Sequence, residues 1–161
     1  MATPKKATRK STTARPQEAT AMLRADHKVV SALFEQYATS RAQGKKKEIV
    51  ARICLELTVH AQLEEEIFYP AFKQALKDKQ LEPEARVEHA TLKDLIAQVK
   101  DIEPDGEMFD AKIKVLSEYV KHHVKEEQNE MFLKAKASKK LDLIAIGAQM
   151  AARKEQLLSA M

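Results

Sequence analysis

Apolar residues recur at alternating spacings of three and four along most of the chain, and this repeat constrains the fold more than any other feature of the sequence. Residues at this spacing share one face of an α-helix, so each segment predicts an amphipathic helix with a buried face. Glycine occurs only three times in 161 residues, so little interrupts such helices. The sequence therefore predicts an all-α fold. We expect five helices, at about 20–42, 46–78, 83–101, 106–136 and 139–160.

The connections between the first four helices are short. The clearest is "EPDG" at 103–106, whose proline and glycine separate the third helix from the fourth. Four amphipathic helices joined in this way predict an up-down-up-down four-helix bundle. We divide the chain into a basic flexible tail (1–19), the bundle (20–136) and a C-terminal helix packed on the bundle (137–161). The expected packing face of that last helix consists of Leu141, Ile144, Ala148, Ala151 and Leu158.

The positive charge of the chain is concentrated near its N-terminus. Residues 1–17 carry five of the 28 lysines and arginines and no acid, so the rest has 23 basic against 24 acidic residues. Such a segment cannot bury enough apolar surface to fold. A solvated, disordered tail is the simpler interpretation, and weak contact with nucleic acid is the alternative.

Two features bear on the location of the protein. No apolar run approaches the roughly 18 residues that span a bilayer, and the first residues lack the hydrophobic stretch of a signal peptide. The single cysteine, Cys54, excludes an internal disulfide and fits a reducing compartment. We therefore expect a cytoplasmic protein without a membrane partner.

The motif His-x-x-x-Glu occurs twice at positions where the helical repeat calls for apolar residues. The first copy is His60 with Glu64. In the second, "HHVKEE", either of two adjacent histidines could point inward, but neighbours on a helix lie about 100° apart. Only His123 with Glu127 continues the stripe of Leu116 and Val120. We therefore expect these four polar side chains to face the core.

An internal repeat adds two further histidines. The pair "DH" at 26–27 precedes the first motif, and "EH" at 88–89 precedes the second at nearly the same distance. The first two helices thus match the next two as a duplicated hairpin, which predicts a site with a pseudo-twofold axis. The inward polar residues are His27, His60, Glu64, His89, His123 and Glu127.

Six such residues in one core require compensation, because a buried carboxylate without a partner costs several kcal/mol. A layer of mutually hydrogen-bonded side chains is one interpretation, and bound metal is the other. Imidazole and carboxylate ligands without thiolate suit iron, manganese or zinc. Two metals bridged by Glu64 and Glu127, each with two histidines, use all six side chains. The Glu-x-x-His pairs of ferritin-like di-iron proteins do not occur.

With these residues placed, the chain resembles the hemerythrin-like family, specifically the histidine-histidine-glutamate cation-binding domains of bacterial type. The likeness runs over about 20–136 through "LRADHKVV", "HAQLEEEIFYPAF", "EHATLKDL" and "HHVKEEQNEMF". It implies a non-haem di-iron centre in a four-helix bundle, with an oxo or hydroxo bridge. The implied ligands are His27 and His60 for one iron, His89 and His123 for the other, and Glu64 and Glu127 as bridges.

Two departures from the oxygen-carrying members bear on function. Those members have a further histidine where this chain has Lys93, and an aspartate five residues after the last histidine where this chain has Glu127 at four. The resemblance therefore implies open coordination positions and the handling of peroxide, oxygen or nitric oxide, by sensing or by consumption. The alternatives are a non-enzymatic oxygen- or iron-binding module and a metal-free helical interaction protein. The expected partners are small molecules, with no obligate protein partner.

Overall fold

The computed structural model describes residues 17–161, and the part of the predicted tail before residue 17 lies outside the described residues. The structure confirms the all-α prediction. Two of the predicted helices are long segments in which a π-helical turn joins two α-helices. The elements are α1 (Ala19–Thr39), α2 (Gln43–Leu63), η1 (Glu64–Phe68), α3 (Tyr69–Leu76), α4 (Leu81–Ala97), α5 (Gly106–Glu126), η2 (Glu127–Met131), α6 (Phe132–Ala137) and α7 (Leu143–Ser159).

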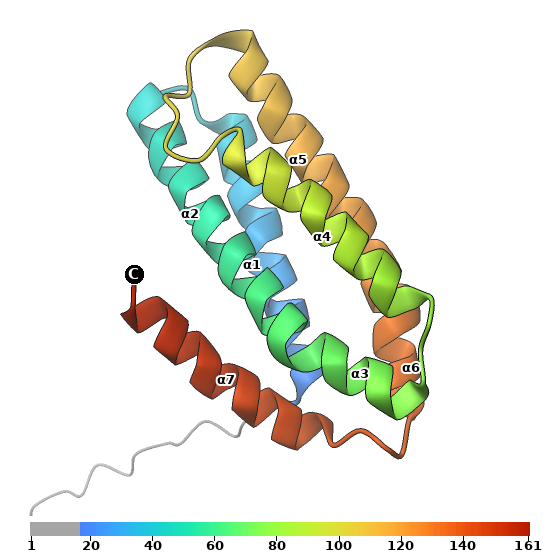
Figure 1. Cartoon of the computed structure of the whole chain (residues 1–161). Coiled ribbons are helices and arrows are strands. Elements are labelled where there is room, and N and C mark those ends of the chain that lie inside the picture. Colours follow the sequence, from blue (N-terminus) through green and yellow to red (C-terminus); the bar gives the residue numbers. More distant parts are fainter. Residues whose placement is uncertain (1–16) are drawn as a thin grey trace, which may run out of the picture.

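The helices form an up-down-up-down bundle, as Figure 1 shows. Its four rods are α1, the continuous segment α2–η1–α3, α4, and the continuous segment α5–η2–α6. Residues with positive φ lie at two of the turns between the rods. Lys77 adopts a left-handed conformation after α3, and Gly106 has a φ of 83° at the start of α5. No helix within residues 17–161 is long and apolar enough to cross a membrane.

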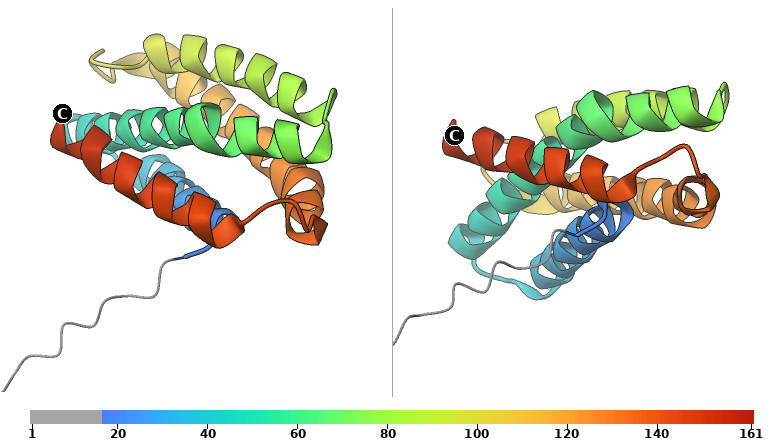
Figure 2. Two further views of the ribbon diagram at one scale, coloured as in Figure 1. Left: turned by 60° about the horizontal axis from the view of Figure 1, so that its bottom comes forward. Right: turned by 90° about the horizontal axis from the view of Figure 1, so that it is seen from below.

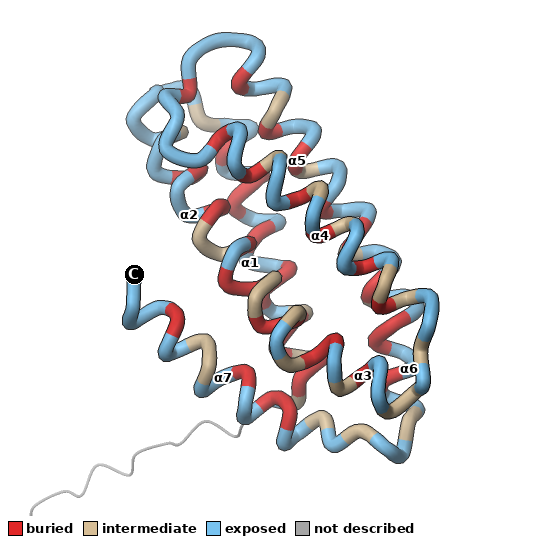
Figure 3. Tube along the Cα trace, viewed as in Figure 1, coloured by how far each residue is buried: buried red, intermediate tan, exposed pale blue. Residues whose placement is uncertain are grey.

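Each rod has buried residues that alternate with exposed ones along the helix (Figure 3). The buried residues form two apolar clusters with a polar layer between them. One cluster fills the half of the bundle near the α1–α2 and α4–α5 connections, and includes Val30, Ile53 and Leu116. The other fills the opposite half and includes Leu23, Leu63 and the aromatic residues that follow η1. All six inward polar residues predicted from the sequence are buried.

Both π-helical turns begin at the glutamate of a His-x-x-x-Glu motif. A π-helical turn inserts one extra residue into the helical repeat and is frequent at functional sites. Helical spacing counted on from Glu64 would place Ile67 and Ala71 on the buried face, and the extra residue changes this. Those side chains are half-buried, and Phe68, Tyr69 and Phe72 fill the core instead.

The helix α7 lies across the bundle against α1, α2 and η1 (Figure 2). The predicted packing face is wrong by about one residue, since Ile144 is 62% exposed and Ala148 and Ala151 are also exposed. The residues of α7 that are buried are Ile146, Gly147, Met150 and Leu157. The buried residues still follow helical spacing, but the position of α7 on α1, α2 and η1 decides which side of the helix is covered.

Gly147 allows α7 to approach the start of α1 closely. A Cβ at this position would clash with the backbone oxygen of Gln17 and would lie 3.0 Å from the backbone nitrogen of Ala19. We expect Gly147→Ala to lower the free energy of unfolding by about 1–3 kcal/mol, because the backbones must separate. Thermal melting measures this. Gly44→Ala is the control, since among the described residues nothing would meet a Cβ there within 4 Å; equal losses in both variants would contradict the prediction.

Candidate metal centre

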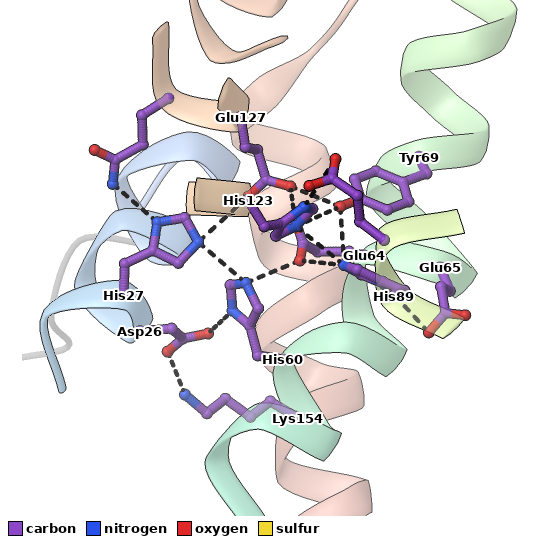
Figure 4. A network of polar contacts seen from close by, with 12 residues as sticks. Asp26, His27, His60, Glu64, Glu65, Tyr69, His89, His123, Glu127 and Lys154 are labelled. Atoms are coloured by element: carbon purple, nitrogen blue, oxygen red, sulfur yellow. Dashed lines mark hydrogen bonds and ion pairs between the residues drawn. The ribbon is translucent and has the colours of Figure 1, made fainter. Parts of the chain in front are cut away.

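The six buried polar residues converge in the layer between the two apolar clusters (Figure 4). Each rod contributes a histidine, and the two glutamates begin η1 and η2. We call His27 and His60 the first histidine pair, and His89 and His123 the second. The structure thus brings together all of the site residues predicted from the sequence.

The two histidine pairs are related by the pseudo-twofold repeat. In the first pair the two Nε2 atoms lie 3.2 Å apart, with the rings tilted by 61° and their centres 4.8 Å apart. In the second pair the corresponding values are 3.2 Å, 63° and 4.8 Å. In both pairs the Nε2 atoms face the centre of the bundle, where their lone pairs can reach a shared cation.

Each glutamate lies between the two pairs. Glu64 Oε1 is 2.8 Å from His60 Nε2 and 3.5 Å from His89 Nε2. Glu127 reaches His27 Nε2 through Oε1 and His123 Nε2 through Oε2, at 3.3 Å in both cases. Both carboxylates therefore contact one histidine of each pair, as carboxylates that bridge two cations would.

The outward Nδ1 atom of every histidine faces a polar side chain. Gln128 Nε2 lies 2.9 Å from His27 Nδ1, and Asp26 Oδ2 lies 3.0 Å from His60 Nδ1. In the second pair the facing atoms are carboxylate oxygens of Glu65, 3.5 Å from His89, and of Glu88, 3.6 Å from His123. A carboxylate that accepts the Nδ1 proton leaves Nε2 free to bind a metal. The sequence signal for two of these residues was the acid that precedes the histidine in "DH" and "EH".

Tyr69 is a further polar group of the centre that the sequence reasoning missed. Its hydroxyl donates to Glu127 Oε2 at 2.6 Å and lies 3.1 Å from His89 Nε2 and 3.3 Å from His123 Nε2. The residue in the equivalent place after η2 is Phe132, which stacks on His27. The phenol therefore distinguishes the surroundings of the second pair from those of the first.

The charges at the centre are strongly coupled. Burial opposes protonation of His60, but Glu64 and Asp26 overcome it and raise the pKa of His60 to about 10. In the same way Glu127 and Glu88 raise the pKa of His123 to about 11 against the effect of burial. Without metal, protons on these imidazoles balance the carboxylates. A cation that binds the Nε2 atoms must displace those protons, so its affinity rises with pH.

The donor set fits bound metal better than a self-satisfied polar layer. No residue between 17 and 161 gives a well-aligned hydrogen bond to either oxygen of Glu64 or to Oε1 of Glu127, although these atoms are buried. Two ligands that each bind one ion at about 2.1 Å lie about 3 Å apart when their bonds are perpendicular. The Nε2 atoms of each pair match this spacing. The donors of His27, His60 and Glu127 lie within 4.8 Å of one another, as do those of Glu64, His89 and His123.

Two residues near the centre lie outside it. The side chain of His122 is 64% exposed and that of its neighbour His123 only 6%, which confirms the phase chosen for the second motif. Lys93 points to the surface, where its Nζ pairs with Glu65 Oε1 at 2.7 Å. It does not contribute to the donors at the centre.

The fold and the buried donors define a four-helix-bundle protein with a histidine–carboxylate cation site. The chain belongs to the hemerythrin HHE cation-binding domain family, whose model matches residues 18–135. A hemerythrin HHE cation-binding-domain-containing protein from Mycobacterium kansasii, known from a crystal structure, has a similar fold. The TM-score is 0.76 at 22% identity, over 89% of each chain.

One curated relative is a protein of Nostoc sp. (strain PCC 7120) named DNA nickase. It is 31% identical over 111 residues, which make up 69% of this chain. The match spans 31% of that protein's length, so most of the relative lies outside it.

Proposed function

We propose that the chain holds two iron ions at its buried centre and uses them to sense or consume a small oxidant. The supporting observation is the arrangement of two histidine pairs, each converging through Nε2, with Glu64 and Glu127 each contacting both pairs. Six donors shared by two ions leave coordination positions open for a ligand. Mixed imidazole and carboxylate donors suit iron.

Two adjacent irons would supply and accept electrons and polarise a bound oxidant as Lewis acids. The protein's own residues would orient the ligands and hold a proton. By accepting from Nδ1, Asp26 would fix the tautomer of His60 when Nε2 is deprotonated. Tyr69 would keep its phenolic proton beside the second pair. Burial and the carboxylates of Glu127 and Glu64 raise the pKa of Tyr69 well above its usual value, so the phenol remains a hydrogen-bond donor.

The space beside the histidines supports a small ligand. A cavity of about 30 Å³ is bounded by all four histidines and by apolar side chains that include Leu57, Leu92 and Val120. This volume holds about one or two water molecules. Hydrogen peroxide, oxygen and nitric oxide fit such a space, whereas a larger organic substrate does not.

The proposal is tested by loading the full chain with iron and adding hydrogen peroxide. We expect about two irons per chain and steady loss of peroxide, with none in the metal-free protein. His122→Ala, which changes only the exposed neighbour of His123, should retain both iron and activity. If the loaded protein instead takes up and releases oxygen reversibly and leaves peroxide intact, oxygen binding replaces peroxide handling as its function.

A further inference from the structure

The helix α7 lies outside the four-helix bundle, but one of its side chains reaches the centre through a single intermediate. Lys154 Nζ donates to Asp26 Oδ1 at 2.8 Å, and the other oxygen of the same carboxylate lies 3.0 Å from His60 Nδ1. Figure 4 shows these three side chains in a row. The side chain of Asp26 is 10% exposed and that of Lys154 28%. The contact is therefore a partly buried ion pair, which solvent screens less than a surface pair.

The second half of the centre has a different arrangement. Glu88 takes the place of Asp26 there, facing His123 Nδ1 at 3.6 Å. Among the described residues, the other cation paired with Glu88 is the exposed His122, at 4.0 Å. A lysine also stands behind a carboxylate of the second half, where Lys93 pairs with Glu65, but Glu65 is 3.5 Å from His89 Nδ1 and the side chain of Lys93 is 58% exposed. The helix α7 places its more buried lysine behind Asp26, in the first half.

The position of Lys154 is well defined because α7 is held along its length. Asp142 caps the start of the helix by accepting from Ala145 N at 3.0 Å, and Gly147 permits close packing on α1. Arg153 pairs with Glu66 in η1 at 2.7 Å. The lysine is thus presented to Asp26 by a docked helix.

We propose that Lys154 is a positioning residue for His60: by holding one oxygen of Asp26, it aims the other at Nδ1 and so sets the strength of metal binding at the first histidine pair alone. The inference rests on the proposed function, because it requires metal at both pairs. A carboxylate with one oxygen fixed cannot rotate away from the imidazole. The positive charge of Lys154 also partly balances the negative charge of Asp26. The hydrogen bond from His60 Nδ1 to Asp26 is therefore weaker than it would be to an unpaired carboxylate.

Removal of the lysine should affect one of the two metals. Changes in residues that support a metal ligand typically cost 10–100-fold in metal affinity, and Lys154 acts through one further residue. In Lys154→Met we expect one of two irons to be removed at about tenfold lower chelator concentration, while the other is retained as in the unmodified protein. The reduction potential of the loaded centre should fall, because Asp26 keeps its full negative charge. Lys154→Arg should restore both values.

Arg153→Met is the matched control, since it removes the neighbouring cation of α7 without touching Asp26. It should leave both chelator midpoints and the potential unchanged. Equal effects of Arg153→Met and Lys154→Met would overturn the inference, because docking of α7 would then be the cause. Unchanged iron retention and potential in Lys154→Met would overturn it as well. Failure of the unmodified protein to hold two irons would instead reject the proposed function.

Discussion

Iron loading should raise the melting temperature of the full chain by about 10 °C. Metal that binds only the folded state stabilises it by about 4 kcal/mol at a thousand times its dissociation constant, and each kcal/mol shifts melting by about 2–4 °C at this size. The physical reason is local. Glu64 and Glu127 have four carboxylate oxygens, and three of them accept no well-aligned hydrogen bond from the described residues although they are buried. Bound metal would satisfy these oxygens.

The size of this shift should depend on pH in a defined direction. Protonation of His60 and His123, whose pKa values are raised to about 10 and about 11, stabilises the metal-free fold. That contribution is complete below the unfolded histidine pKa of about 6.5 and is lost as pH rises through the folded values. Metal binding requires the same nitrogens to be deprotonated. The difference in melting temperature between loaded and metal-free protein should therefore widen from pH 6.5 towards pH 9.

Differential scanning calorimetry of both forms at several pH values measures this. His123→Ala and His122→Ala form a matched pair of adjacent histidines, of which only the first should reduce the shift, by about half if one of two irons is lost. A melting temperature that does not change when binding has been confirmed would place the ligands outside the core.

Replacement of a bridging carboxylate should lower the iron content per chain more than replacement of a histidine does. Glu64 and Glu127 each contact one histidine of both pairs, whereas His60 belongs to one pair. We expect Glu64→Ala and Glu127→Ala to reduce iron from about two per chain to nearly none, and His60→Ala to leave about one. Elemental analysis after gel filtration measures the content.

The melting of each metal-free variant is the control for folding. If the metal-free form of a variant melts at the same temperature as the metal-free unmodified protein, the variant is folded. Its loss of iron then reports weaker binding. The bridging assignment fails if the glutamate variants keep one iron per chain as His60→Ala does. It also fails if Glu126→Ala, on the exposed side of the same helix, loses as much iron as Glu127→Ala.

Much of this fold and site followed from the sequence because both depend on helical periodicity, which is a local property. A residue three or four positions from a core residue faces the core, so Val30, Leu116 and His123 could each be placed without knowledge of any other helix. The repeat of the histidine motifs then indicated that two hairpins would bring their polar residues to one level. The structure places all six at that level.

Other features depended on contacts between distant segments, and only the tertiary structure decided them. The π-helical turn η1 places Tyr69 in the centre and leaves Ile67 half-buried, because an extra residue enters the repeat where Glu64 faces the histidines. The buried face of α7 follows from where that helix crosses α1 and α2. Lys154 and Asp26 are far apart in sequence, and only the docking of α7 brings them together beside His60. Periodicity determines which way a side chain points from its own helix, whereas packing determines what it meets there.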